Sequence, residues 1–587
     1  MIQSRTHNCN ELRIGNVGER VTLVGWFENM RKVSKNLGFV ILRDFYGTTQ
    51  LVVETEEMMN VMDDINKEST ISVEGVVRER SSKNASLPTG EIEVVPDKIE
   101  ILGKCIYNAL PFEINQSKDA DENARLKYRY LDLRNPNMKK NIVMRSQIVA
   151  ELRQRMYALN FMEITTPILT CSSPEGARDY LVPARNHPGK FYALPQAPQQ
   201  FKQILMASGF DRYFQIAPCF RDEDARADRS PGEFYQLDME MAFASQEDVF
   251  SIVEQVLPPV FEKYGIYKEA SKAPFVRIPY LEAMDKYGSD KPDLRIDLVL
   301  TDATEVMQGC GFAAFEGQTV KAIVVDGFTA TRKQIDAICA EVEVQTARKG
   351  FWFRVDENGE FVGGISKFLQ DRKEEVIKAL GLKNGDFVGL AAGKKLEAQK
   401  TAGVYRKLLG AASEKHMKKD CYEFCWIVDF PMYEIGEESG ELEFCHNPFS
   451  MPQGGMDALN NQDPLEILAY QYDLVCNGVE LSSGAVRNHD PEIMIKAFEL
   501  VGLGEADVKA KFPAMYNAFC YGAPPHAGIA PGVDRMIMLI CGEESIREII
   551  PFPMNKNAMD IMMGAPGTVE QKQLDELHLA ITAKPEE

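Results

Sequence analysis

The chain has 587 residues, a length that is too great for one hydrophobic core and that predicts several domains. Its hydrophobic fraction of 45% and charged fraction of 26% are those of an ordinary globular protein. The start of the sequence lacks an apolar signal core, and no uncharged apolar run reaches the length of a bilayer span, so we expect no membrane association. The net charge of -21 is unfavourable for a wholly basic nucleic-acid surface but permits a local one.

The cysteines indicate a reducing compartment. There are twelve, and none forms a C-x-x-C pair. Cys421 and Cys425 are four residues apart, but no histidine or second pair nearby completes a zinc site. We therefore expect a cytoplasmic protein without disulfides.

The first hundred residues predict a small barrel. Short apolar and β-branched stretches, separated by turn residues, occur at 21–27, 38–45, 49–54, 70–78 and 91–101. Five such strands suit a Greek-key OB-fold barrel over residues 1–105, an architecture that often binds single-stranded nucleic acid. A polar connector over 106–140 follows.

The rest of the chain alternates between helical and strand patterns. Apolar residues at helical spacing begin near 148, and 164–169 predicts a strand. We divide this part into the first segment of a larger domain at 141–285, an inserted α/β domain at 286–421, a second segment that resumes the larger domain at 422–562 and a C-terminal extension at 563–587.

Two distant arginines suit a triphosphate ligand. Arg221 lies in the charged run FRDEDARADR, and Arg535 ends the turn GVDR. A guanidinium group bonds two phosphate oxygens at once and stays protonated. Taken alone, however, Arg221 in such a run is more often a solvated ion-pair residue.

Six motifs in one order resolve that choice. They are SSPEGARDYLVP, FYALPQAPQQFKQILM, FRDEDARADR, EFYQLDME, NGVELSSGAVR and PPHAGIAPGVDR. Together they resemble the aspartyl-tRNA synthetases of the bacterial type, which are class II aminoacyl-tRNA synthetases. The resemblance covers nearly the whole chain. It implies an α+β multidomain fold, in which an antiparallel catalytic sheet binds ATP.

The resemblance assigns residues to ATP and to Mg²⁺. It implies that Arg221 contacts the α-phosphate, that Glu223 serves the ATP and acceptor-end region, and that Arg535 holds the γ-phosphate. Further ATP-binding residues are expected at Asp222, Glu480, Gly532, Val533 and Asp534. Asp473 and Glu480 match the carboxylates that hold Mg²⁺, which prefers one or two such ligands beside substrate phosphates.

The same resemblance assigns a pocket for L-aspartate. Lys202 and Arg487 match the cationic pair for the side-chain carboxylate. Positions that receive the ammonium group or shape the pocket are matched by Glu175, Gln199 and Asp238, and Arg221 is also expected to contact aspartate. Two buried cations facing one carboxylate would reject asparagine, which leaves them uncompensated.

Three positions depart from the family pattern. His446 matches a mobile-loop histidine near aspartate, but Asn447 stands where the family usually has a second histidine. Gly232 adds a residue to the loop before EFYQLD. Pro531 replaces a bulky residue before the last motif's final glycine. The change at Asn447 bears on substrate closure, and those at Gly232 and Pro531 bear on loop geometry near ATP.

In the barrel, the resemblance implies contacts with the tRNA anticodon. Phe39 matches a base-stacking aromatic and Gln50 a base-reading amide, with Arg31 and Glu93 nearby. An exposed phenylalanine stacks on an unpaired base, whereas amide and carboxylate groups read base edges. The alternative, equally supported by the sequence, places Phe39 in the barrel core.

The expected activity is that of a homodimeric aspartate–tRNA ligase that uses ATP and Mg²⁺ to charge tRNA(Asp). The dimer expectation comes from the helix and strand that end at Pro167, which resemble the class II interface motif. Three alternatives stay open: an enzyme that also charges tRNA(Asn), an amide-forming relative of the asparagine synthetase type, and a non-catalytic RNA-binding regulator. The role of the inserted domain cannot be predicted from its sequence.

Overall fold

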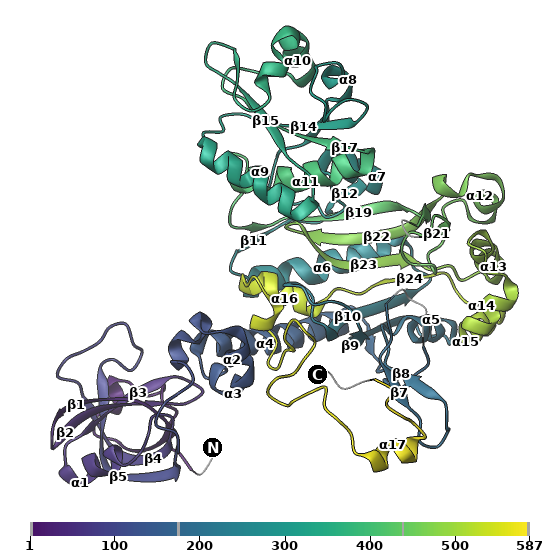
Figure 1. Cartoon of the computed structure of the whole chain (residues 1–587). Coiled ribbons are helices and arrows are strands. Elements are labelled where there is room, and N and C mark those ends of the chain that lie inside the picture. Colours follow the sequence, from purple (N-terminus) through teal and green to yellow (C-terminus); the bar gives the residue numbers. More distant parts are fainter. Residues whose placement is uncertain (1–3, 173–176, 437–438, 584–587) are drawn as a thin grey trace. The chain divides into compact units, whose positions relative to one another are not determined.

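The computed structural model describes residues 4–172, 177–436 and 439–583. It divides into two compact units, Met1–Ala120 and Asp121–Glu587, which we describe separately (Figure 1). Within the described residues, no helix is both long enough and apolar enough to cross a membrane.

The first unit is a closed five-stranded barrel with the strand order β1-β2-β3-β5-β4. Its strands are β1 (Arg20–Ser34), β2 (Leu37–Arg43), β3 (Thr48–Val53), β4 (Thr70–Glu79) and β5 (Ile92–Gly103). Alternate residues point inward, so that Val21, Leu23, Val40 and Leu42 are fully or almost fully buried in one apolar core. Helix α1 (Glu56–Asp63) contributes Met59 and Met62 to that core. The predicted OB-fold barrel is confirmed.

The predicted connector is shared between the two units. A 3-10 helix, Ile114–Asp119, belongs to the first, whereas α2 (Glu122–Lys127), α3 (Arg129–Asp132) and the start of α4 (Pro136–Ala158) belong to the second. The sequence marked the polar character of this stretch but gave no sign of the contacts that divide it.

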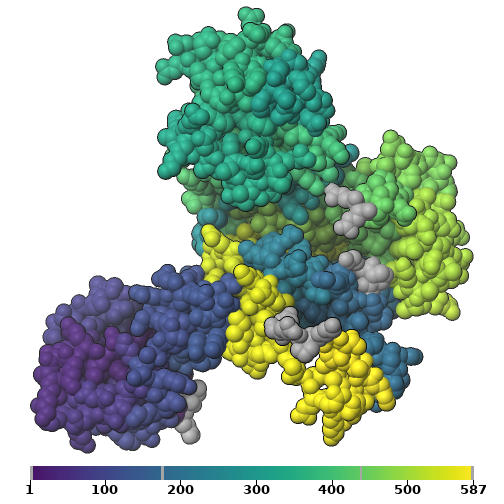
Figure 2. Space-filling view, in the orientation of Figure 1, coloured from purple at the N-terminus to yellow at the C-terminus, as the bar shows by residue number. Residues whose placement is uncertain are grey.

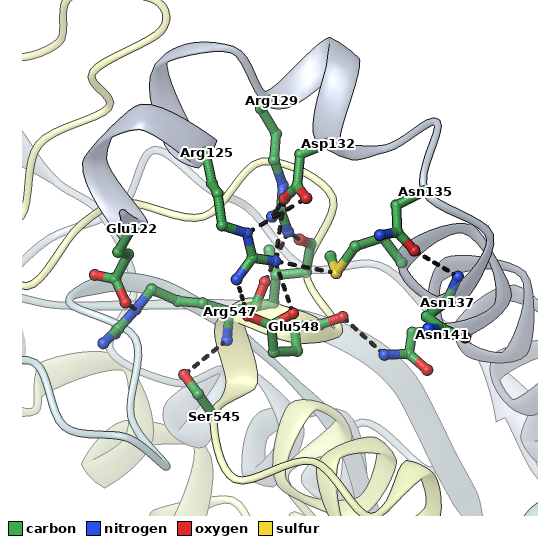
Figure 3. Close-up of polar contacts among 12 residues, drawn as sticks. Glu122, Arg125, Arg129, Asp132, Asn135, Asn137, Asn141, Ser545, Arg547 and Glu548 are labelled. Atoms are coloured by element: carbon green, nitrogen blue, oxygen red, sulfur yellow. Dashed lines mark hydrogen bonds and ion pairs between the residues drawn. The ribbon is translucent and has the colours of Figure 1, made fainter. Parts of the chain in front are cut away.

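Buried ion pairs fasten α2 and α3 to the chain that follows α16 (Val533–Cys541). Arg125 donates from both terminal nitrogens to Glu548, at 2.8 and 2.9 Å, and Arg129 pairs with the fully buried Asp132 at 2.5 Å (Figure 3). Arg129 also donates to the backbone carbonyl oxygens of Arg547, Ile550 and Pro551. We call these residues the connector clamp.

Breaking the connector clamp should destabilise the second unit. Glu548→Ala leaves Arg125 buried with only Asp132 as a counter-charge, and removal of one partner of a buried pair costs about 3 kcal/mol or more. We expect a lower midpoint of thermal unfolding, measured by circular dichroism. Glu544→Ala, at an exposed site four residues away, is the control and should match the parent. Equal midpoints for both variants would contradict this account of the clamp.

The second unit is built on an eight-stranded sheet, in the order β12-β19-β22-β23-β24-β10-β9-β6. Its strands are β12 (Val276–Pro279), β19 (Phe424–Pro431), β22 (Leu468–Cys476), β23 (Val479–Val486), β24 (His526–Ile529), β10 (Gly232–Ala242), β9 (Arg212–Arg221) and β6 (Met162–Glu163). All neighbours are antiparallel except the two edge pairs, β12 with β19 and β6 with β9. The expected antiparallel sheet is confirmed.

Helices α4, α6 (Gln246–Tyr264) and α16 cover one face of this sheet. Ile148, Val253 and Ile537 from these helices join Leu237 and Trp426 from the strands in the largest apolar core. The opposite face is therefore free of these helices and can carry polar groups. The predicted strand at 164–169 is wrong, because the strand is Met162–Glu163 and the chain leaves the sheet before Pro167.

Residues 300–393 contain a second, five-stranded sheet of order β13-β14-β17-β15-β16, which forms a lobe of its own (Figure 2). Its strands are β13 (Leu300–Asp302), β14 (Thr319–Val325), β17 (Phe387–Gly393), β15 (Phe351–Val355) and β16 (Phe361–Val362). The helices of this region are α7 (Tyr280–Tyr287), α8 (Thr304–Met307), α9 (Arg332–Thr346), α10 (Lys373–Leu380) and α11 (Lys395–Ala411). Helix α7 contacts both β19 of the large sheet and α11.

The remaining elements are short. Three two-stranded ribbons pair β7 (Leu181–Pro183) with β8 (Phe191–Ala193), β11 (Glu269–Ala270) with β18 (Cys421–Tyr422), and β20 (Tyr433–Ile435) with β21 (Leu442–Phe444). The other helices are α5 (Gln199–Ala207), α12 (Gly455–Asn461), α13 (Pro491–Leu500), α14 (Glu505–Lys511), α15 (Pro513–Cys520) and α17 (Gln571–Leu577).

Candidate active site

Four buried charged side chains meet on the polar face of the large sheet. Lys202 on α5 lies with its Nζ 2.5 Å from Asp238 Oδ1 and 3.4 Å from Glu240 Oε2. Arg487, which follows β23, donates to both oxygens of Glu240 at 2.8 and 3.2 Å. All four residues are at most 2% exposed. We call them the charge quartet.

Strand alternation explains why two acids of the quartet face the same way. In β10, Leu237, Met239 and Met241 point into the apolar core. Asp238 and Glu240 therefore point to the opposite face of the sheet. Arg487 reaches them from β23, whose partner β24 also pairs with β10.

The quartet contains as many anions as cations, and its polar groups are not all satisfied. Burial raises the pKa of Asp238, and Lys202 only partly opposes this effect. Burial also acts to raise the pKa of Glu240, but Arg487 and Lys202 outweigh it and lower the value. Among the described residues, Asp238 Oδ2 and Gln199 Nε2 are buried without a hydrogen-bond partner. Such atoms are suited to bind the charged groups of a small ligand.

The structure brings together most of the predicted aspartate-binding residues. Lys202, Asp238 and Arg487 are members of the quartet, and Gln199 begins the helix that carries Lys202. Glu175 lies outside the described residues. His446 is exposed but lies between the partly buried Cys445 and Asn447, and its ring is edge-to-face with that of Phe430, with 5.1 Å between the ring centroids.

Sequence reasoning missed three buried residues of this region, Glu240, Gln203 and His526. Glu240 is the only quartet member that contacts both cations. His526 Nε2 lies 3.1 Å from Gln203 Oε1, and burial lowers its pKa to about 4, so the ring is neutral near pH 7. The signal for Glu240 was the spacing in QLDME, because strand residues two apart share a face.

Arg221 ends β9, directly opposite Gly232 at the start of β10. Its guanidinium carbon lies 5.1 Å from the Phe234 ring centroid, and Nε donates weakly to the Gln196 carbonyl at 3.4 Å. No described carboxylate forms an ion pair with Arg221, which leaves its terminal nitrogens able to bind an anionic ligand. Gly232 has φ 89°, a conformation that favours glycine at this β9–β10 turn.

The loop between β9 and β10 carries its own ion pairs. Glu223 pairs with Arg229 at 2.7 Å, and Asp222 with Arg178 at 3.5 Å. Arg535 spans from this loop to β23, because it lies 3.6 Å from the Asp228 carboxylate and donates to the Glu480 carbonyl at 2.9 Å.

The three residues before Arg535 are fixed within the protein. The Gly532 amide donates to the Leu481 carbonyl, and Val533 packs in the apolar core. Asp534 pairs with Arg145 at 2.5 Å and accepts from the Tyr235 amide at 3.0 Å. These contacts orient the start of α16 and thereby Arg535. Pro531 accepts a hydrogen bond from the Leu237 amide.

Asp473 and Glu480 are brought together by the β22–β23 hairpin, in which Asp473 pairs with Ser483 and Glu480 with Val475. Burial strongly raises the pKa of Asp473, and the nearby Glu480 adds to the effect. Asp473 Oδ1 is buried without a hydrogen-bond partner among the described residues. A buried, unsatisfied carboxylate oxygen beside a second carboxylate fits a Mg²⁺ ion that takes its remaining ligands from substrate phosphates.

One side of the barrel carries polar and aromatic groups, of which Arg31 is exposed, Phe39 and Gln50 are half-buried and Glu93 is buried. Phe39 is half-buried, lies between the buried residues Gly38 and Val40 and is not part of the barrel core, so the interpretation that placed it in the core is wrong. The Arg31 guanidinium carbon lies 5.0 Å from its ring centroid. Gln50 donates to Glu93 at 3.0 Å, and Glu93 accepts from Arg78 at 2.8 Å.

Asn447 shapes the turn after His446. Its side-chain oxygen accepts from the Phe449 amide at 2.9 Å, and its carbonyl accepts from the Ser450 amide. The side chain that departs from the family pattern therefore has a local structural use.

Comparison with known proteins agrees with these features. Residues 121–556 match the family of class II tRNA synthetases (D, K and N), and residues 21–102 match the OB-fold nucleic acid binding domain. An aspartate–tRNA ligase of Streptomyces coelicolor is 53% identical over 99% of both chains. An aspartate–tRNA(Asp/Asn) ligase of Zymomonas mobilis is 52% identical over 99% of this chain and 98% of the relative.

Solved structures show the same fold at low identity. A putative aspartyl-tRNA synthetase from Leishmania major is 21% identical, with a TM-score of 0.59 over 94% of both chains. The asparaginyl-tRNA synthetase from Pyrococcus horikoshii is 18% identical, with a TM-score of 0.57 over 94% of this chain and 98% of that one. The matched family and the full-length relatives confirm the resemblance found in the sequence, and the chain belongs to the class II tRNA synthetases, within the family of bacterial aspartate–tRNA ligases.

Proposed function

We propose that this aminoacyl-tRNA ligase activates L-aspartate with ATP and transfers it to the 3′ end of tRNA(Asp). The charge quartet is the observation that carries the proposal. Lys202 and Arg487 offer two buried cations to a side-chain carboxylate, and Asp238 keeps an unsatisfied oxygen for an ammonium group. Glu175 is retained in this proposal as a further acceptor for the ammonium group.

In the first step, the α-carboxylate of aspartate attacks the α-phosphate of ATP, and pyrophosphate leaves. Negative charge builds on the phosphate oxygens, and Arg221 and Arg535 stabilise it from two sides. Arg221 needs no rearrangement, because it has no carboxylate partner among the described residues. Arg535 must exchange its contact with Asp228 for a phosphate.

Asp473 and Glu480 would hold Mg²⁺ beside the phosphates. The ion supplies positive charge to the phosphoryl oxygens when bound. The chain's own contribution is to keep two carboxylates side by side on one hairpin, where each is held by backbone pairing. Glu223 and Asp222 complete the ATP region by shaping the loop between β9 and β10.

In the second step, the terminal 3′-hydroxyl of tRNA takes the aspartyl group and AMP leaves. We assign anticodon binding to the barrel, residues 1–105, through Phe39 and Gln50, with Arg31 and Glu93. The support is the position of Phe39 outside the barrel core and the polar network around Gln50. Neither step requires a covalent intermediate with a side chain.

Phe39→Ala should weaken tRNA use without affecting aspartate activation. Loss of one aromatic stacking platform costs about 1–3 kcal/mol, which corresponds to a roughly 5- to 150-fold lower kcat/KM for tRNA(Asp). Charging assays and aspartate-dependent pyrophosphate exchange separate the two steps. Ile101→Ala, at a partly exposed position of β5, is the control. An unchanged kcat/KM for tRNA in Phe39→Ala would contradict the assignment.

The exchange of labelled pyrophosphate into ATP tests the activation step. We expect exchange that depends on L-aspartate and on Mg²⁺, and little exchange with L-asparagine. Exchange that is equal with both amino acids would contradict the role given to the charge quartet.

A second function is favoured by the relatives. The Zymomonas mobilis protein, at 52% identity, is described as acting on tRNA(Asp/Asn). The same enzyme activity with broader tRNA choice therefore stays a candidate, and the two anticodons differ at one base. An amide-forming enzyme is less well supported, because the barrel provides an RNA-binding surface that it would not need.

We also propose a homodimer, formed around the end of α4 and β6. Three large apolar side chains in this region are about half exposed: Tyr157 at 52%, Met162 at 55% and Leu169 at 53%. A cytoplasmic location fits a translation enzyme whose cysteines form no disulfide.

A further inference from the structure

The predicted inserted domain begins with a segment that lies against the β22–β23 turn. A Cβ atom added to Gly478 in that turn would lie 3.2 Å from the Asp293 side chain. This hairpin carries Asp473 and Glu480, the two proposed metal ligands. Residues 288–298, which we call the leading segment, therefore contact the hairpin that carries the proposed metal ligands.

Helix α11, at the other end of the inserted domain, fixes the leading segment. The buried Arg406 donates to the carbonyl oxygens of Asp293, Ile296 and Leu298. A Cβ added to Gly403 would lie 2.3 Å from the Gly288 carbonyl oxygen, so the two backbones are in direct contact. The position of the leading segment is thus set by the inserted domain.

The leading segment places one cation at the proposed metal site. Lys291 Nζ lies 2.9 Å from Glu480 Oε2, whereas Arg535, the other cation near this carboxylate, lies 3.8 Å from Oε1. Lys291 Nζ also lies 3.9 Å from Asp290 Oδ2, a longer contact than the one with Glu480. Its side chain is 41% exposed, so the ammonium group can move away without leaving a buried cavity.

We propose that the inserted domain supplies Lys291 as a positioning residue for the metal carboxylates. The inference rests on the proposed function of Asp473 and Glu480. When nucleotide is absent, Lys291 neutralises part of the charge of this pair, and a divalent cation alone is disfavoured. ATP, which brings further oxygen ligands for the cation, overcomes that competition. Lys291 thereby couples occupation of the metal carboxylates to the presence of ATP.

Binding of Mn²⁺ to the full-length protein without ATP tests the proposal. The electron paramagnetic resonance signal of free Mn²⁺ is measured against protein concentration. Removal of a cation at 2.9 Å from the carboxylate should tighten Mn²⁺ binding by about tenfold or more in Lys291→Met. Lys291→Gln, a second neutral variant, should show the same change. It keeps the test possible if Lys291→Met fails to fold. Lys291→Arg should bind as the parent does.

Lys286→Met is the matched control, because Lys286 lies five positions earlier and pairs with Glu282 at 2.6 Å. In pyrophosphate exchange, Lys291→Met should change the KM for ATP at fixed Mg²⁺ and leave the KM for aspartate unchanged. Equal Mn²⁺ affinity in the parent and in both neutral variants would overturn the proposal. Lack of aspartate-dependent exchange in the parent protein would instead contradict the proposed function.

Discussion

Arg221→Ala is expected to lower aspartate-dependent pyrophosphate exchange by about 10³-fold. Arg221 is positioned at the end of β9 by pairing with Gly232 and by the Phe234 ring. Its terminal nitrogens face no described carboxylate, so a phosphate is the natural partner. Removal of such a preorganised cation withdraws charge stabilisation from the α-phosphate as pyrophosphate leaves.

The same substitution should hardly affect folding. Only a cation–π contact and one weak hydrogen bond are lost, so the free energy of unfolding should fall by about 1 kcal/mol or less. Arg212→Ala, at the other end of β9, is the control and should retain exchange. Activity of Arg221→Ala within about threefold of the parent would contradict the ATP assignment.

Lys202→Met is expected to raise the KM for aspartate by about 100-fold and to leave the KM for ATP nearly unchanged. The side-chain carboxylate of aspartate would lose one of two buried cations, and a charged hydrogen bond of this kind contributes about 3 kcal/mol. Arg487 would stay in place, because both of its bonds go to Glu240. Discrimination against asparagine should fall, since the pocket would then hold one cation less.

Steady-state pyrophosphate exchange with aspartate and with asparagine measures this effect. Lys263→Met is the control, because Lys263 is exposed and pairs with Glu151 away from the pocket residues. Lys202→Met also leaves Asp238 without its cation, so thermal unfolding must be recorded beside the kinetics. A parent-like KM for aspartate in folded Lys202→Met would contradict the assignment of the pocket.

Much of the fold could be predicted because local patterns and long-range structure agree. The short apolar stretches of the first hundred residues, separated by turn residues, predicted the barrel. The six motifs, through the family that they resemble, predicted the antiparallel sheet. The segment 164–169 was predicted wrongly, because a strand needs a hydrogen-bonding partner that the sequence does not show. The pairing with β9 covers Met162 and Glu163 and ends at Ile164, whose amide donates to the Phe214 carbonyl. The division of the connector depends on ion pairs with Glu548, more than four hundred residues away in sequence.

The candidate site shows the same limit. Lys202 and Arg487 were predicted as a pair by resemblance, but the contact of Glu240 with both of them depends on the packing of α5 and β23 against the face of β10 that carries Asp238 and Glu240. Lys291 gave no sequence signal, since its contact with Glu480 depends on how the inserted domain packs. Whether Phe39 belongs to the barrel core was likewise decided by the barrel's strand alternation in three dimensions.

The central claim is that this enzyme attaches aspartate to tRNA(Asp), and charging of labelled aspartate with ATP and Mg²⁺ tests it most directly. Separate transcripts of tRNA(Asp) and tRNA(Asn) should be compared. We predict charging of tRNA(Asp), and added charging of tRNA(Asn) would identify the broader specificity. Failure to charge either competent transcript with the folded protein would contradict the claim.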